Sequence, residues 1–141
     1  MVSTTKGETV FTAIENEAPL PGQASRVVLV VDDDSSHRWM LGIALRAAQF
    51  DVIEAADGCA ALEQVTHHVV DLVISDVQMP HMDGLALLDH LRDTRPGLPV
   101  FLVSAHPDLK RESILERGAS GFFVKPFGLR ELVSRVAAQL S

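Results

Sequence analysis

Short apolar runs alternate along the chain with longer segments whose apolar residues recur at helical spacing. The runs are rich in β-branched and aromatic residues, which is typical of strands buried in a parallel sheet; they occupy residues 27–31, 52–54, 72–74, 99–103 and 122–124. The segments between them predict amphipathic helices over residues 35–48, 59–66, 84–94, 106–117 and 129–140. Five such alternations predict βαβ units with right-handed crossovers. We therefore expect an α/β fold, a doubly wound five-stranded parallel sheet with five helices.

Local signals mark the ends of several helices. We expect Ser35 or Ser36 to cap the first helix, and the fourth to start at His106-Pro107-Asp108. The tripeptide Arg95-Pro96-Gly97 is expected to end the third helix. In the first helix the apolar positions at helical spacing are Met40, Leu41, Ile43, Ala44, Leu45 and Ala48.

Residues 1–25 lack the periodicity of the rest of the chain. They are rich in Thr, Glu, Ala, Pro and Gly, and Pro19-Leu20-Pro21-Gly22 breaks any helix begun before it. We expect a flexible N-terminal tail over residues 1–25, with a structured partner-binding tail as the alternative. The remaining residues, 26–141, are enough for one domain with a real core.

Charge and composition narrow the possible classes of function. The formal net charge is −7 and the 12 Lys and Arg residues are scattered, whereas nucleic-acid binding needs clustered basic residues. Cys59 is the only cysteine, which excludes an intrachain disulfide. The sequence has no export signal and no apolar stretch of about 20 residues, the length needed to span a bilayer. We expect a cytoplasmic protein that contacts neither nucleic acid nor membrane directly.

The carboxyl ends of the predicted strands carry the candidate chemistry. Asp32 and Asp33 follow the first strand, Asp76 the third, Ser104 the fourth and Lys125 the fifth. These ends meet at one edge of a parallel sheet, where open α/β folds bind their ligands. Each residue alone could be a helix cap, a turn residue or a solvated surface charge. Their joint placement favours a functional site.

Three carboxylates at one edge need a compensating charge. Two unit charges about 4 Å apart repel by about 4 kcal/mol at an effective dielectric constant of about 20. A hard divalent cation removes this repulsion, and an all-oxygen ligand set suits Mg²⁺; the scattered histidines lack zinc-ligand spacing. Beside such a metal, Asp76 could attack phosphorus while Lys125 and Ser104 stabilise the transferred oxygens. The residues therefore indicate phosphoryl transfer.

Four motifs carry a resemblance to a known family. They are Val30-Val31-Asp32-Asp33-Asp34, Asp76-Val77-Gln78-Met79-Pro80 with Asp83-Gly84, Val103-Ser104-Ala105 and Lys125-Pro126-Phe127. Through them the sequence resembles response-regulator receiver domains of two-component signalling, over about Arg26 to Leu140. The resemblance implies the flavodoxin-like receiver fold of single-domain chemotaxis-type receivers.

The resemblance also implies a role for each site residue. Asp76 would be the phosphoacceptor and Lys125 its ion-pair partner. Asp32, Asp33 and Asp76, with the backbone carbonyl of Gln78, would bind Mg²⁺. The hydroxyl of Ser104 would follow the phosphoryl group and act as a switch.

The same resemblance implies roles for Phe122, Gln78 and His106, and a conformation for the peptide bond before Pro126. Phe122 occupies the aromatic switch position, where many relatives have Tyr; its ring can still change rotamer but offers no hydroxyl to a partner. Gln78 and His106 stand where the family tunes self-dephosphorylation, either by orienting an attacking water or by obstructing it. The peptide bond before Pro126 is expected to be cis.

The implied function is a phosphorelay receiver that catalyses only its own phosphorylation and dephosphorylation. A histidine kinase would donate the phosphoryl group, and a downstream protein partner or phosphotransfer protein would bind the face formed by the helices after the fourth and fifth strands. We expect a monomer or a weak dimer. The sequence ends just after the last predicted helix, so we expect no attached effector domain after it; a stand-alone receiver and a receiver from a hybrid kinase both stay open.

Two rival functions also stay open. One is a Mg²⁺-dependent phosphatase or phosphotransferase that uses an Asp nucleophile on small molecules; it would need a cap or substrate pocket, for which we expect no residues to be left. The other is an interaction module with a vestigial site, which the full set of acidic, hydroxyl and ammonium side chains argues against.

Overall fold

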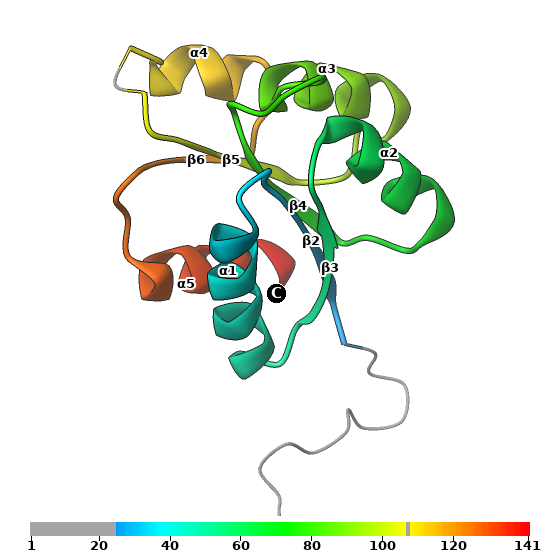
Figure 1. Cartoon of the computed structure of the whole chain (residues 1–141), viewed down its shortest axis with the longest axis vertical. Helices are drawn as coiled ribbons and strands as arrows, with labels where there is room; N and C mark the ends of the chain where they lie inside the picture. The colour runs from blue at the N-terminus through cyan, green and yellow to red at the C-terminus, as the bar shows by residue number, and fades with distance from the viewer. Residues whose placement is uncertain (1–24, 107) are drawn as a thin grey trace, which may run out of the picture.

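The computed structural model describes residues 25–106 and 108–141. Five parallel strands form one sheet in the order β3-β2-β4-β5-β6 (Figure 1). Their bounds are Val27–Val31 (β2), Asp51–Ala55 (β3), Leu72–Asp76 (β4), Val100–Ser104 (β5) and Gly121–Val124 (β6). The expected α/β fold with a five-stranded parallel sheet is thus confirmed. The tail expected over residues 1–25 lies, except for Ser25, outside the described residues.

Five helices cover the two faces of the sheet. They are α1 (Ser35–Ala47), α2 (Gly58–His67), α3 (Gly84–Thr94), α4 (Arg111–Glu116) and α5 (Leu129–Leu140). Alternate residues of each strand point to opposite faces: Leu29 packs in a core with α2, α3 and α4, whereas Val28 packs in a second core with α1 and α5. None of the helices in the described part is long and apolar enough to cross a membrane.

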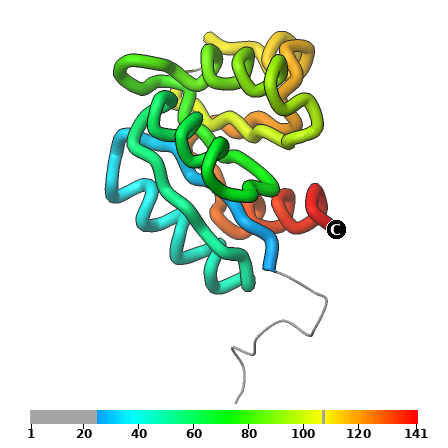
Figure 2. The backbone as a smooth tube through the Cα atoms, turned by 90° about the vertical axis from the view of Figure 1, so that its right-hand side faces the viewer, coloured from blue at the N-terminus to red at the C-terminus, as the bar shows by residue number. Residues whose placement is uncertain are grey.

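The strand order reverses between β2 and β4, which are neighbours in the sheet although β3 lies between them in the chain. Open α/β sheets bind ligands at such a switch point, beyond the carboxyl ends of the strands. The start of β2 and the end of α5 lie together at the other end of the domain (Figure 1 and Figure 2). The fold therefore places the ends of β2 and β4 side by side, away from both ends of the described chain.

The fourth helix is shorter than the sequence predicted. It begins at Arg111 rather than at His106, and its N-cap, Lys110, makes no capping hydrogen bond through its side chain. A residue before proline is disfavoured in helical conformation, and the backbone N–H of His106 donates instead to the hydroxyl of Ser104, at 3.0 Å. The prediction of a helix from residue 106 was therefore wrong by about one turn.

The first helix differs from the prediction at its cap and on one face. Asp34, not Ser35 or Ser36, is the N-cap, and its Oδ1 accepts hydrogen bonds from the N–H groups of Ser36 and His37, at 2.8 and 3.3 Å. These hydrogen bonds hold the pKa of Asp34 below its ordinary value, with the bond from His37 contributing most. Leu41 and Leu45 are buried as the helical spacing suggests, but Met40 and Ile43 are each 47% exposed. The apolar surface of α1 is thus wider than the core can cover.

Candidate functional site

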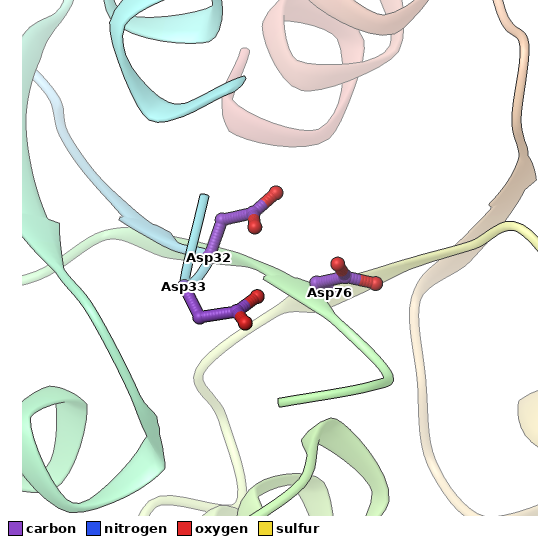
Figure 3. A group of neighbouring side chains, drawn as sticks. All are labelled: Asp32, Asp33 and Asp76. Atoms are coloured by element: carbon purple, nitrogen blue, oxygen red, sulfur yellow. The ribbon is translucent and has the colours of Figure 1, made fainter. Parts of the chain in front are cut away.

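Three carboxylates meet at the switch point of the sheet. Asp32 and Asp33 directly follow β2, and Asp76 is the last residue of β4. One carboxylate oxygen from each lies within 4.8 Å of the other two (Figure 3). The parallel pairing of β2 with β4, in which Val31 lies opposite Ser75, brings these residues together across about 40 positions of sequence. The structure therefore assembles the acidic cluster that the strand ends predicted.

The three carboxylates differ in environment. Asp32 is 4% exposed, Asp76 is partly buried and Asp33 is exposed. Burial raises the pKa of Asp32 above its ordinary value of 3.8, and the nearby charge of Asp76 raises it further. The N–H of Asp34, which donates to Asp32 Oδ1 at 2.9 Å, and the ammonium of Lys125 act in the opposite direction without cancelling the effect of burial. The charged form of Asp32 is therefore less favourable here than in a fully solvated aspartate, and a cation bound at the cluster would favour it.

This arrangement fits a hard divalent cation. The cluster offers three carboxylate oxygens, and burial and the charge of Asp76 both disfavour the charged form of Asp32. Oxygen ligands at an open, partly solvated edge suit Mg²⁺, which keeps several waters. No histidine or cysteine belongs to a group of three potential ligands in the described residues, so the cluster has no soft ligand that would favour zinc.

Arg38 anchors the loop that follows β2, residues 32–34, which we call the acidic loop. The sequence analysis missed this role. Its Nη1 donates to the backbone carbonyl of Asp32 at 2.6 Å, and its Nε donates to Oε1 of Glu54 at 3.2 Å. Glu54 lies on β3, opposite Val30 of β2 in the parallel register. The planar guanidinium thus ties the loop after β2 to the neighbouring strand. The only signal in the sequence is an arginine one helical turn after the acidic run.

His37 stands against the acidic cluster and was also missed. Its Nδ1 lies 3.6 Å from Asp32 Oδ2 and 3.8 Å from Asp34 Oδ2. Within the described residues this nitrogen is buried and has no hydrogen-bond partner. The ring is therefore a neighbour of the carboxylates and is not fixed by a hydrogen bond at that nitrogen.

Lys125 reaches the carboxylate of Asp76 from the end of β6. Its Nζ lies 3.3 Å from Asp76 Oδ2, and the two side chains are 24% and 12% exposed. The other carboxylate oxygen, Oδ1, accepts a long hydrogen bond from the N–H of Gln78, at 3.4 Å. The two carboxylate oxygens of Asp76 thus have different partners. One contacts the ammonium of Lys125, and the other accepts from the backbone of the loop that follows β4.

Gly84 lets helix α3 start directly against this loop. A Cβ at position 84 would overlap the carbonyl oxygen of Asp76 and would lie 2.8 Å from the Cα of Val77. Asp83 caps the same helix by accepting from the N–H of Ala86 at 2.8 Å. The Asp83-Gly84 pair therefore combines a cap with the only residue type that fits so close to the backbone of Asp76.

The other predicted residues surround this centre. Ser104 is fully buried at the end of β5, and its hydroxyl oxygen accepts from the N–H of His106. Phe122 is 1% exposed in the core beneath α3 and α4. The peptide bond between Lys125 and Pro126 is cis, as expected. The roles assigned to Ser104, Phe122, Gln78 and His106 stay predictions.

Comparison with known proteins agrees with this geometry. Residues 28–137 match the family described as the response regulator receiver domain. The chain is 40% identical to the DNA-binding transcriptional regulator NtrC of Escherichia coli over 116 residues, which is 82% of this chain and 25% of that protein. It is 42% identical to the transcriptional regulatory protein PrrA of Mycobacterium tuberculosis over 120 residues, 84% of this chain and 52% of that protein. The chain therefore spans a quarter to about half the length of these relatives.

Solved structures show the same fold. The receiver domain of a Francisella response regulator matches with a TM-score of 0.76 and 31% identity, over 81% of this chain and 95% of that one. The receiver domain of NtrX from Brucella abortus matches with a TM-score of 0.73 and 32% identity, over 80% and 96% of the two chains. Fold, acidic cluster and family match agree, and the chain belongs to the response regulator receiver domains of two-component signalling.

Proposed function

We propose that Asp76 accepts a phosphoryl group from the phosphohistidine of a histidine kinase in the presence of Mg²⁺. The observation that carries this proposal is the position of Asp76. One of its carboxylate oxygens lies 3.3 Å from Lys125 Nζ, and one lies within 4.8 Å of carboxylate oxygens of Asp32 and Asp33. A carboxylate in this position can act as a nucleophile toward phosphorus. The ammonium beside it can neutralise charge on a transferred group.

The transfer is a displacement at phosphorus. A carboxylate oxygen of Asp76 attacks the phosphorus atom, the bond from phosphorus to the histidine nitrogen breaks, and the imidazole leaves with the electron pair of that bond. Asp32, Asp33, Asp76 and the backbone carbonyl of Gln78 would hold Mg²⁺, which supplies positive charge for the phosphoryl oxygens. Lys125 supplies the second positive charge. The product is an acyl phosphate on Asp76.

The response begins at Ser104. Its hydroxyl oxygen already accepts from the N–H of His106, and a hydroxyl can donate its own proton at the same time. A phosphoryl oxygen on Asp76 gives that proton an acceptor, so movement of Ser104 would move the segment that leads to α4. This helix has six residues and no side-chain cap, which favours a shift in its population of conformers. The proposal also includes a change of rotamer at Phe122, the aromatic switch position. Gln78 and His106 would tune self-dephosphorylation.

The test is Mg²⁺-dependent labelling by acetyl phosphate, followed by intact mass spectrometry. We expect one phosphoryl group per chain with Mg²⁺, almost none with excess EDTA, and loss of the group in hydroxylamine, which cleaves acyl phosphates. Continuous release of phosphate from small phosphorylated metabolites, without a labelled protein, would instead favour the phosphatase. Absence of both labelling and Mg²⁺ binding would favour the vestigial module.

Arg38 provides a prediction about the metal site that does not depend on transfer. Arg38→Lys keeps the charge but loses the planar fork that joins Asp32 to Glu54. We expect the Mg²⁺ dissociation constant to rise by about threefold to tenfold, since one charge-assisted hydrogen bond to the loop is lost. Isothermal titration calorimetry measures this change.

Arg46→Lys is the matched control. The Arg46 guanidinium lies 3.9 Å from the same Glu54, but no hydrogen bond joins it to the acidic loop. We expect its Mg²⁺ affinity to equal that of the unmodified protein. Equal losses in both variants would mean that Glu54, rather than the contact with Asp32, governs the site.

We further propose that protein contacts carry the signal in and out. Trp39, Met40 and Ile43 on α1 are 63%, 47% and 47% exposed, and grouped exposed apolar residues often mark an interface. This surface supports a protein phosphodonor. The output would pass to a downstream protein or phosphotransfer partner, with the chain as a monomer or weak dimer in the cytoplasm.

A further inference from the structure

One ring nitrogen of His37 is buried against the acidic loop, although the side chain as a whole is 44% exposed. His37 belongs to the first turn of α1, where its backbone N–H donates to Asp34 Oδ1 at 3.3 Å. The Nδ1 of the ring lies 3.6 Å from Asp32 Oδ2 and 3.8 Å from Asp34 Oδ2. In the described part of the chain this nitrogen has no hydrogen-bond partner. A polar atom is thus shielded from solvent beside a candidate metal ligand, without a hydrogen bond of its own.

The surroundings of Nδ1 favour the tautomer that carries a proton on this nitrogen. A neutral imidazole has one donor nitrogen and one acceptor nitrogen, and ionised carboxylate oxygens can only accept. A lone pair on Nδ1 would be repelled by the oxygens of Asp32 and Asp34, whereas an N–H group would be attracted. The side chain of Asp34 is 50% exposed and can bind water, but that of Asp32 is 6% exposed. The buried oxygen of Asp32 therefore gains more from this donor.

We infer that His37 is a positioning residue for the metal site: its Nδ1–H donates to Asp32 Oδ2 and fixes the carboxylate in the orientation that binds the cation. The inference rests on the Mg²⁺ site of the proposed function, but not on phosphoryl transfer. The separation of 3.6 Å exceeds that of a hydrogen bond, about 3 Å. A small movement of the ring or of the carboxylate therefore closes the bond, and His37 does not itself contact the ion.

With this bond, each carboxylate oxygen of Asp32 has its own donor. Oδ1 accepts from the N–H of Asp34 at 2.9 Å, and Oδ2 accepts from His37. Figure 3 shows that Asp32 points from the edge of the sheet toward the side on which α1 and α5 lie. With a single donor, the carboxylate could rotate away from Asp33 and Asp76. Because an oxygen has two lone pairs, it can accept a hydrogen bond and bind a cation together. The second donor thus favours the metal-binding orientation.

Two other roles for the ring make different predictions. Direct coordination of the ion needs a lone pair on Nδ1, where the two carboxylates favour a proton, and His37 is not among the three potential ligands that meet in the described residues. If the ring instead only fills space beside the acidic loop, the identity of its atoms is unimportant. The position of one hydrogen-bonding nitrogen therefore separates these roles.

The experiment compares His37→Asn with His37→Gln. The amide nitrogen of Asn can occupy the place of Nδ1, whereas the longer Gln places its amide nitrogen where Nε2 lies. Isothermal titration calorimetry at pH 8 measures the Mg²⁺ dissociation constant. We expect His37→Asn to stay within about twofold of the unmodified protein and His37→Gln to raise the constant about tenfold, as for loss of an outer-shell partner. His68→Gln is the matched control: His68 is the exposed C-cap of α2, and the variant should bind Mg²⁺ normally.

A second readout is the NMR chemical shift of the two ring nitrogens of His37, which distinguishes an N–H from a lone pair. The unmodified protein should show an N–H at Nδ1, and Mg²⁺ should move the signal of its proton as the bond to Asp32 closes. A lone pair at Nδ1 in Mg²⁺ would overturn the inference and favour direct coordination. Equal Mg²⁺ affinities of His37→Asn and His37→Gln would also overturn it and leave the ring a packing role. An unmodified protein that bound no Mg²⁺ would contradict the metal site of the proposed function, and this inference with it.

Discussion

Replacing Asp76 with Asn is expected to abolish Mg²⁺-dependent labelling by acetyl phosphate, with at least a hundredfold loss of rate. Asn keeps the size of the side chain and one oxygen that can accept from the N–H of Gln78, as Asp76 Oδ1 does at 3.4 Å. It removes the negative charge that makes the carboxylate a nucleophile and that pairs with Lys125 at 3.3 Å. Intact mass spectrometry after a fixed incubation measures the effect, and circular dichroism verifies the fold.

Asp83→Asn is the control for this loss. Asp83 lies in the loop between β4 and α3 and caps α3 through Ala86, and Asn is an equally good N-cap. The variant removes one negative charge from the loop that follows β4 and should be labelled at the normal rate. If Asp76→Asn were labelled at another aspartate or at Ser104, the assignment of the nucleophile would be wrong, even though the acidic cluster would still hold the metal.

The sequence was sufficient for the sheet and for the position of the acidic cluster. The three central strands β2, β4 and β5 are mainly apolar runs buried on both faces, a pattern that differs from the one-sided pattern of the helices. Because parallel strands end at one edge, the residues that follow them converge whatever the details of the loops. Asp33 and Asp76 could therefore be placed together although 43 positions separate them.

The sequence was insufficient where a contact depends on register or on competing hydrogen bonds. Arg38 meets Glu54 only because β2 and β3 pair with Val30 opposite Glu54, and no local pattern encodes that register. The start of α4 depends on whether the N–H of His106 enters a helix or donates to Ser104. The exposure of Met40 depends on how α1 and α5 pack, which helical spacing alone does not define.

Asp32→Asn is expected to stabilise the metal-free protein at neutral pH while removing most of its Mg²⁺ affinity. Burial raises the pKa of Asp32 in the folded state above its unfolded value. The folded protein therefore binds this proton more tightly than the unfolded chain, and the free energy of unfolding falls as pH rises through the interval between the two pKa values. Above that interval the charged Asp32 destabilises the fold, and a neutral Asn does not.

The expected gain is on the order of 1 kcal/mol, because repulsion within 4.8 Å is reduced by Lys125 and by solvent. For a domain of this size it corresponds to a rise in melting temperature of about 4 °C. Thermal unfolding in EDTA at pH 7 measures it, and the difference between the two proteins should shrink as pH approaches 3.8, the ordinary value for an aspartate. Glu63→Gln, which removes an exposed charge from the middle of α2, should change the melting temperature by less than about 1 °C.

Mg²⁺ should reverse the order of the melting temperatures of the unmodified protein and Asp32→Asn. A ligand that binds only the folded state stabilises it in proportion to the logarithm of its concentration over the dissociation constant. The unmodified protein should therefore gain melting temperature with each addition of Mg²⁺ and overtake Asp32→Asn, which keeps too few carboxylates to bind the ion tightly. A variant that was destabilised in EDTA would show that Asp32 carries a structural role. A variant stabilised by Mg²⁺ as strongly as the parent would show that the ion binds elsewhere. If the two plots of melting temperature against Mg²⁺ concentration cross, the acidic cluster binds the metal at the expense of stability in its absence.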